Sequence, residues 1–302
     1  MVFSGPGWSA DDEKTKENPS QEPTYELRPH WEPGKRYRWL QRLDTVVTVA
    51  GLGKQRMEWR QHIHITAGKE TATQELEIGI ESIRVDMEVT GNRSRYYFDQ
   101  TIPLRFQDRK GIQGMLLKHT EDFVRNRYRL SLSEDGEHKL IVIPPETSKE
   151  PKEANELWSR VPWEALTSAL LHQGIPNKPL EEGATWQHTE ELAVAPHGQA
   201  EWRLDCEFNG FKEHEGSSLA LIQFKGSLNA TFHQDQGVED SPGISIKLSK
   251  ARGLTLIDYN KKLIASTVIK LDGKLHSLGL PGAAEGETAP LKQTITLSLL
   301  DR

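Results

Sequence analysis

Apolar and polar residues alternate with a period of two through most of the chain after residue 24. In the first such segment, one face is apolar and consists of Tyr37, Trp39, Leu43, Val47 and Val49. The intervening positions are charged and include Arg36, Arg38, Arg42 and Asp44. The same alternation recurs over 56–65, 201–208 and 294–299. This pattern predicts half-buried antiparallel strands with apolar side chains inward and polar side chains outward.

Further strands are expected wherever similar runs lie between turn-forming residues. These runs are 75–90, 93–101, 123–132, 138–143, 185–194, 218–232, 243–258 and 262–272. Glycine and asparagine mark reversals between strands, at Gly51-Leu52-Gly53, Gly91-Asn92, Asp135-Gly136 and Tyr259-Asn260. Such residues accept the backbone conformations of tight turns.

One strand changes phase along its length. Its apolar residues occupy even positions at Leu76, Ile78 and Ile80, and then odd positions at Ile83, Val85 and Met87. A one-residue shift would turn the apolar side chains to the wrong face of the sheet. We therefore expect a β-bulge near Glu81–Ser82.

Helices are predicted at only two places, 109–120 and 154–173. The second has Trp158, Val161, Leu166 and Leu170 on one side and ends at Gly174, before Ile175-Pro176. The expected fold is mainly β, with long antiparallel strands in a curled sheet or half-barrel packed on one or two short helices.

Breaks in the pattern suggest the organisation of the chain. Residues 1–23 read as a disordered tail, and the polar stretch 144–156 is the best linker. This predicts an N-terminal β-rich half, 24–150, and a helix with a C-terminal β-rich half, 151–302, unless the two form one continuous domain. Gly34 and Gly183 each precede an aromatic residue by three positions at the head of a strand. This short internal echo reflects either two related halves or a chance match.

Composition narrows the class of protein. The net charge is −6, which argues against nucleic-acid binding, and no apolar run approaches the roughly 18 residues of a transmembrane segment. The single cysteine, Cys206, excludes an intrachain disulfide framework. No intact signal peptide is present, so residues 1–10 are either an ordinary tail or the stub of a trimmed signal.

Few residues suggest catalysis or metal binding. His62 and His64 have the spacing of two metal ligands on one strand face, but Arg56 and Arg60 on the same face favour an ordinary solvated surface. No G-x-S-x-G nucleophile motif occurs, and no cofactor is expected. Cys206 alternates with apolar residues and is interpreted as a buried small side chain.

Residues of the 154–173 helix are the candidate ligand site. Trp158, Trp163, Leu166 and Leu170 either pack into the core or line a pocket for a lipid or another apolar ligand. The alternative is left open by the sequence.

Four segments, in order, carry a resemblance to a known family. They are WEPGKRYRWLQRLDTVVTV (31–49), YRLSLSEDGEHKLIVI (128–143), IPNKPLEEGATW (175–186) and GLTLIDYNKKLIASTVIKL (253–271). Together they resemble an uncharacterised family of secreted or lipid-anchored bacterial envelope proteins. The resemblance implies a location in the periplasm or on the cell surface, although this sequence lacks the family's usual signal sequence and lipid-attachment cysteine. The expected architecture is also similar to that of half-barrel lipoprotein carriers of acyl chains, a likeness by analogy.

These observations favour a non-enzymatic envelope protein that binds an apolar ligand or a protein partner. The alternative is a structural or assembly module without a small-molecule ligand, and an uncharacterised hydrolase comes third. A carrier needs an apolar hollow, whereas an assembly module fills its core with side chains.

Overall fold

The structure of the chain is a computed structural model. The described residues are 23–49, 51, 53–68, 73–89, 91–99, 127–133, 138–143, 174–193, 198–232, 244–277 and 288–300. The two predicted helices, nearly all of the 1–23 tail and the Asp135-Gly136 turn lie outside them. The regular elements of the described part are strands, and no helix occurs among these residues.

Twelve strands make up one sheet. They are β1 (Arg36–Val49), β2 (Gly53–Ala67), β3 (Thr73–Val89), β4 (Asn92–Asp99), β5 (Arg127–Ser133), β6 (His138–Ile143), β7 (Thr185–Ala193), β8 (Gly198–His214), β9 (Ser217–Phe232), β10 (Ile244–Asp258), β11 (Leu263–Ser277) and β12 (Thr288–Leu299). The predicted mainly β fold is confirmed, and each predicted strand corresponds to one of these elements. Most bounds agree within a few residues because turn residues mark the ends of the runs. The runs 201–208, 262–272 and 294–299 are too short: β8 continues to His214, β11 continues to Ser277 and β12 begins at Thr288.

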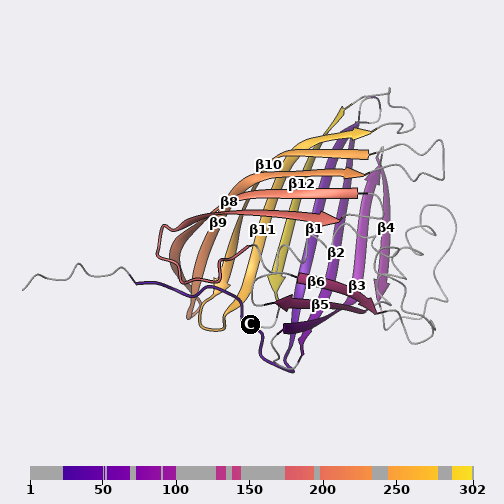
Figure 1. Ribbon diagram of the computed structural model, residues 1–302. Helices are drawn as coiled ribbons and strands as arrows, with labels where there is room; N and C mark the ends of the chain where they lie inside the picture. The colour runs from indigo at the N-terminus through magenta and orange to yellow at the C-terminus, as the bar shows by residue number, and fades with distance from the viewer. Residues whose placement is uncertain are drawn as a thin grey trace, which may run out of the picture.

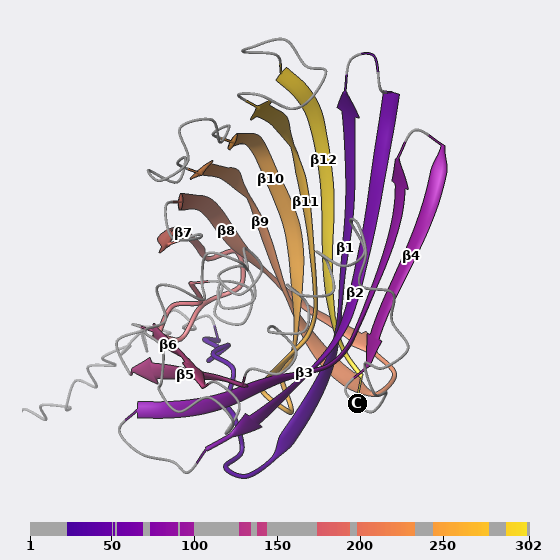
Figure 2. The ribbon, with the colours of Figure 1, turned by 90° about the vertical axis from the view of Figure 1, so that its right-hand side faces the viewer.

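The sheet is antiparallel and open. Its order is β6-β5-β3-β2-β1-β12-β11-β10-β9-β8-β7, with β4 also paired to β3. The pairing of β1 with β12 joins the N-terminal and C-terminal strands into one surface. Figures 1 and 2 show long strands that fan and curl around one face, which we call the inner face.

The predicted bulge is present in β3. Ile63 on β2 lies opposite Ile80, and His62 lies opposite Ser82, so Glu81 has no partner residue. Because of this extra residue, the apolar side chains on both sides of it face inward and are at most 5% exposed: Leu76, Ile78, Ile80, Ile83 and Val85. The bulge therefore keeps the apolar residues of both halves of β3 on the inner face.

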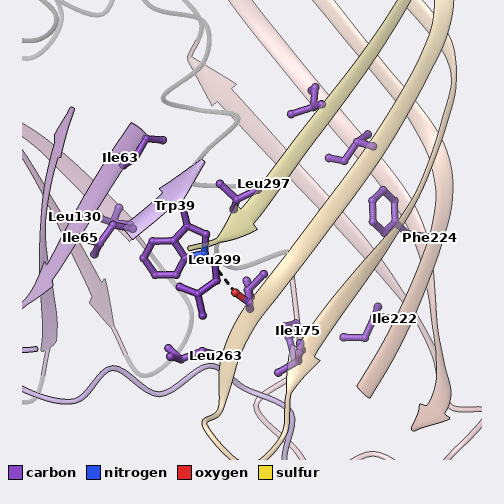
Figure 3. Close-up of a cluster of buried hydrophobic side chains, with 14 of the residues drawn as sticks. Trp39, Ile63, Ile65, Leu130, Ile175, Ile222, Phe224, Leu263, Leu297 and Leu299 are labelled. Carbon is purple, nitrogen blue, oxygen red and sulfur yellow. Dashed lines mark hydrogen bonds between the residues drawn. The ribbon is translucent and has the colours of Figure 1, made fainter. Parts of the chain in front are cut away.

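The sheet branches at the same bulge. Beyond it, residues 82–89 of β3 pair with β4, whereas residues 73–78 on the other side pair with β5 along the same edge. Figure 2 shows β3 bending across the base of the molecule together with β5 and β6. Buried Leu130 of β5 thereby joins the core beside Ile63 and Ile65 of β2 (Figure 3).

Two segments outside the strands cover one end of the inner face, which we call the covered end. Residues 23–35 run along this end (Figure 1), and Tyr25 forms an antiparallel bridge with Leu180 of segment 174–184. Trp31 is 2% exposed and packs against Tyr37 and Trp39, with ring centroids 5.4 and 5.5 Å away. The opposite end, which carries the turns at Gly51 and Gly91, is called the far end.

The echo around Gly34 and Gly183 is repeated in the backbone. Both glycines have positive φ, 77° and 82°, which favours a residue without a Cβ atom. The Gly34 N–H donates to the Ala67 carbonyl, and the Gly183 N–H donates to the Phe208 carbonyl. In each case the following residue accepts a hydrogen bond from that same partner residue, so β1 and β7 start in the same way.

The two faces of β8 predict opposite responses to truncation. Leu204 faces inward and is 8% exposed, whereas Arg203 faces outward and pairs with Glu201 on the surface. We expect Leu204→Ala to lower the free energy of unfolding by about 2–4 kcal/mol and Arg203→Ala by less than about 0.5 kcal/mol. Urea denaturation measures both, and equal losses would show that the faces of β8 are assigned wrongly.

Candidate functional site

The inner face is an almost uninterrupted apolar surface. Figure 3 shows its centre, where Trp39 of β1, Ile63 of β2, and Leu297 and Leu299 of β12 meet in one cluster. The indole N–H of Trp39 donates to the Ile264 carbonyl at 3.4 Å. The residues meet because inward positions of neighbouring strands lie opposite one another in the antiparallel register.

The apolar surface is less well covered toward the far end of β1, β2 and β3. Five large apolar side chains are only partly buried there and form what we call the far-end patch: Leu43, Val47, Met57, Trp59 and Met87. Leu43 lies opposite Trp59, and Met57 lies opposite Met87, so the patch is contiguous over three strands. The described partners of segments 23–35 and 174–184 lie at the covered end, away from this patch.

Two buried glutamines separate the far-end patch from the covered end. Gln41 and Gln61 are 3% and 1% exposed and lie opposite each other on the inner face. The Gln61 amide donates to the Gln41 side-chain oxygen, and the Trp59 indole N–H donates to the Gln61 oxygen at 3.1 Å. These hydrogen bonds offset the cost of burying the amides and hold the Trp59 ring beside the patch.

Sequence reasoning did not single out these glutamines. The signal was nevertheless available, because both occupy the same parity as Trp39 and Ile63 and therefore had to face inward. A polar residue at an inward position indicates a specific hydrogen-bonding partner, here the other glutamine.

The C-terminal side of the inner face carries two buried indole N–H groups, those of Trp186 and Trp202. Trp202 on β8 and Trp186 on β7 have buried Nε1 atoms, and neither has a hydrogen-bond partner among the described residues. Between their positions, Leu204 lies opposite His188 and Cys206 lies opposite Trp186. Both donors therefore belong to the β7 edge of the apolar surface.

Cys206 is confirmed as a buried side chain. It is 3% exposed, and burial, with a smaller contribution from Asp205, raises the pKa of its thiol to about 12. A thiol with so high a pKa is almost entirely protonated at neutral pH and is a poor nucleophile.

The outer face of β1 to β4 is a lattice of ion pairs. The bulge residue Glu81 accepts from Arg36 at 3.0 Å and from Arg38 at 2.8 Å. Burial alone would raise the pKa of Glu81, but the hydrogen bond and charge of Arg38, with the charges of His64 and Arg36, outweigh it and hold the pKa below its usual value. Arg56 and Arg95 similarly pair with Asp44 and Asp86.

His62 and His64 lie on this outer face, as the alternation predicted. His62 Nδ1 lies 2.8 Å from Ser82 Oγ, and His64 Nδ1 lies 3.8 Å from Glu81 Oε1. Among the described residues, no group of three or more His, Cys, Asp or Glu side chains is arranged to hold a metal ion. His62 is therefore hydrogen-bonded next to the bulge, whereas the buried His64 Nδ1 has no hydrogen-bond partner among the described residues.

The predicted ligand-binding residues of the 154–173 helix, Trp158, Trp163, Leu166 and Leu170, lie outside the described residues. Their pocket role therefore stays a prediction. In the part of the chain that the structure describes, no helix has the length and apolar character needed to cross a membrane.

No protein-family model and no curated protein matches this chain. The resemblance to an envelope family, and the location that it implies, therefore stay predictions.

Solved structures offer distant similarities. A structure titled "Lipid-protein interactions in lipovitellin" is 10% identical over 90% of this chain, with a TM-score of 0.45, and this chain spans a quarter (25%) of that one. DynF from the dynemicin biosynthesis pathway of Micromonospora chersina is 9% identical, over 98% of this chain and 92% of its own, with a TM-score of 0.26. A putative AttH from Nitrosomonas europaea is 8% identical, over 87% and 92% respectively, with a TM-score of 0.15. These values assign no function to the chain.

His64 predicts a pH dependence of stability. Burial, followed by the charge of Arg36, lowers the pKa of His64 in the folded chain, although Glu81 and Glu77 oppose this shift. The unfolded chain takes up this proton near pH 6.5, so below that pH it binds more protons than the folded chain. Stability contributed by neutral His64 is therefore present above about pH 6.5 and is lost as the pH falls.

Urea denaturation between pH 8 and pH 5 measures this effect. We expect His64→Gln to flatten the loss of stability on acidification. His214→Gln removes an exposed imidazole from the β8–β9 hairpin and serves as the control. An unchanged pH dependence in His64→Gln would contradict the assignment.

Proposed function

We propose that the protein binds an apolar ligand, an acyl chain, on the inner face of its sheet and acts without catalysing a reaction. The observation that carries the proposal is the far-end patch. Five large apolar side chains from three adjacent strands stay partly exposed there, on the same face that is covered by aromatic residues at the other end.

The physical basis is the cost of leaving such a surface in water. Each buried CH₂ group gains about 0.8 kcal/mol, so covering part of the patch with an acyl chain gives substantial binding free energy. Contiguous exposed apolar surface of this kind commonly marks a binding site. Met57 and Met87 add unbranched, flexible side chains that can adapt to the shape of a ligand.

The same surface could also receive an apolar segment of a protein partner, and the assembly module is the competing reading. The two functions differ in what the surface binds. A carrier binds an acyl chain as a free small molecule, whereas an assembly module needs no small-molecule ligand. Binding of a small acyl probe therefore discriminates between them.

A fluorescent fatty acid provides the test. We expect it to bind with micromolar affinity, and we expect Val47→Thr and Met57→Gln to weaken binding about threefold to tenfold, because each places a polar group against the acyl chain. The matched control is Val46→Thr, the same substitution one residue away on the outer face, which should change affinity by less than about twofold.

Circular dichroism melts would show whether each variant keeps the sheet. Equal effects of Val46→Thr and Val47→Thr would contradict the inner-face site. If the folded wild-type protein does not bind the probe, the carrier function is wrong and the assembly module is favoured.

A further inference from the structure

Two buried indoles on the inner face, those of Trp186 and Trp202, have no hydrogen-bond partner among the described residues. Buried donors in folded proteins are nearly always hydrogen-bonded, because an unpaired buried group carries its full desolvation cost. Trp202 is 2% exposed, and its Nε1 has no partner among the described residues, nor does that of Trp186. By contrast, the indoles of Trp39 and Trp59 on the same inner face both have acceptors.

Trp202 lies level with the far-end patch across the sheet. We call the line of residues that lie opposite one another on successive strands, from Val47 to Trp202, the row. Val47 of the patch is opposite Leu291, and Leu291 is opposite Gly273. On the other side of a bulge in β10, Leu248 is opposite Leu228, which is opposite Trp202. At about 4.8 Å per strand, the five steps from β1 to β8 span roughly 24 Å, and the positions from Val47 to Leu228 are all apolar. The row ends on β7, where Glu190 lies opposite Trp202.

The chemistry of this row favours an uncharged head group. No lysine or arginine is among the buried residues of the described part. A carboxylate placed beside Trp202 would lose its hydration without gaining a buried counter-charge, which is strongly unfavourable. An ester carbonyl needs only a hydrogen-bond donor, and the indole supplies one.

We infer that the protein binds an uncharged acyl ester, whose carbonyl oxygen accepts a hydrogen bond from Trp202 Nε1 and whose chain runs along the row toward Val47. Trp186 lies opposite Cys206, four residues along β8 from Trp202, and is a second donor on the same edge. This inference rests on the proposed apolar binding and adds the class of ligand and its direction. Trp202, Leu228 and Leu291 are almost fully buried, so the ligand reaches the row only when the side chains that bury it move aside.

Indole proton signals from ¹⁵N-tryptophan-labelled protein test the inference, with assignments from single Trp→Phe variants. Three probes are compared: methyl hexadecanoate, hexadecanoate and hexadecane. We expect the ester to shift the Trp202 indole proton downfield, as a hydrogen bond forms, while Trp39, which already has an acceptor, serves as the internal control. Trp202→Phe keeps an aromatic ring and should weaken ester binding about threefold to tenfold, with little effect on hexadecane.

The outcomes separate the two proposals. If hexadecane and the ester bind equally and the Trp202 proton does not move, the head-group inference is wrong and apolar binding stands. If hexadecanoate binds more tightly than the ester and shifts the same proton, the ligand is a fatty acid and the uncharged class is wrong. If no probe binds the folded protein, the proposed function fails as well.

Discussion

A single apolar face on an open sheet is the constraint from which the rest of the structure follows. Twelve antiparallel strands present their inward residues to the same side, and this surface is stable only when something other than water covers it. Every strand must therefore keep its phase. The bulge at Glu81 does this in β3, and the two arginines that hold the Glu81 carboxylate secure the bulge from the outer face.

The cover is built unevenly. At one end, Trp31 and the bridge between Tyr25 and Leu180 close the face with short segments from the two halves of the chain. At the far end of β1 to β3, large apolar side chains remain partly exposed beyond the buried pair of glutamines. In a completed core, all large apolar side chains are covered. This face is covered at one end and partly exposed at the other, which is the arrangement expected of a binding surface.

The strands and the bulge were predictable because they depend on local alternation. The shift of apolar residues from even to odd positions between Ile80 and Ile83 predicted the bulge. Gly51 and Gly91 predicted the turns at which the chain reverses. The pairing of β1 with β12, the branching of β3 and the covering of Trp39 by Trp31 were not predictable in this way. They depend on contacts between residues far apart in sequence, about which periodicity says nothing.

The candidate site shows the same division. Alternation placed Leu43, Val47 and Cys206 on the inner face, and it placed His62 and His64 on the outer face. It could not show that Gln41 and Gln61 are partners or that Trp202 has no partner among the described residues, because hydrogen bonds across a sheet depend on register. The helical ligand site expected at Trp158 to Leu170 lies beyond the described residues, and the inner face itself supplies the site proposed above.

The central claim is that the inner face holds an acyl lipid, and native mass spectrometry tests it most directly. The protein would be delipidated, incubated separately with hexadecanoate and with its methyl ester, and sprayed under non-denaturing conditions. We expect an adduct at the mass of the acyl compound, more abundant for the ester, that disappears when the protein is denatured. A spectrum that contains only the bare folded chain with both compounds, at concentrations well above micromolar, would contradict the claim.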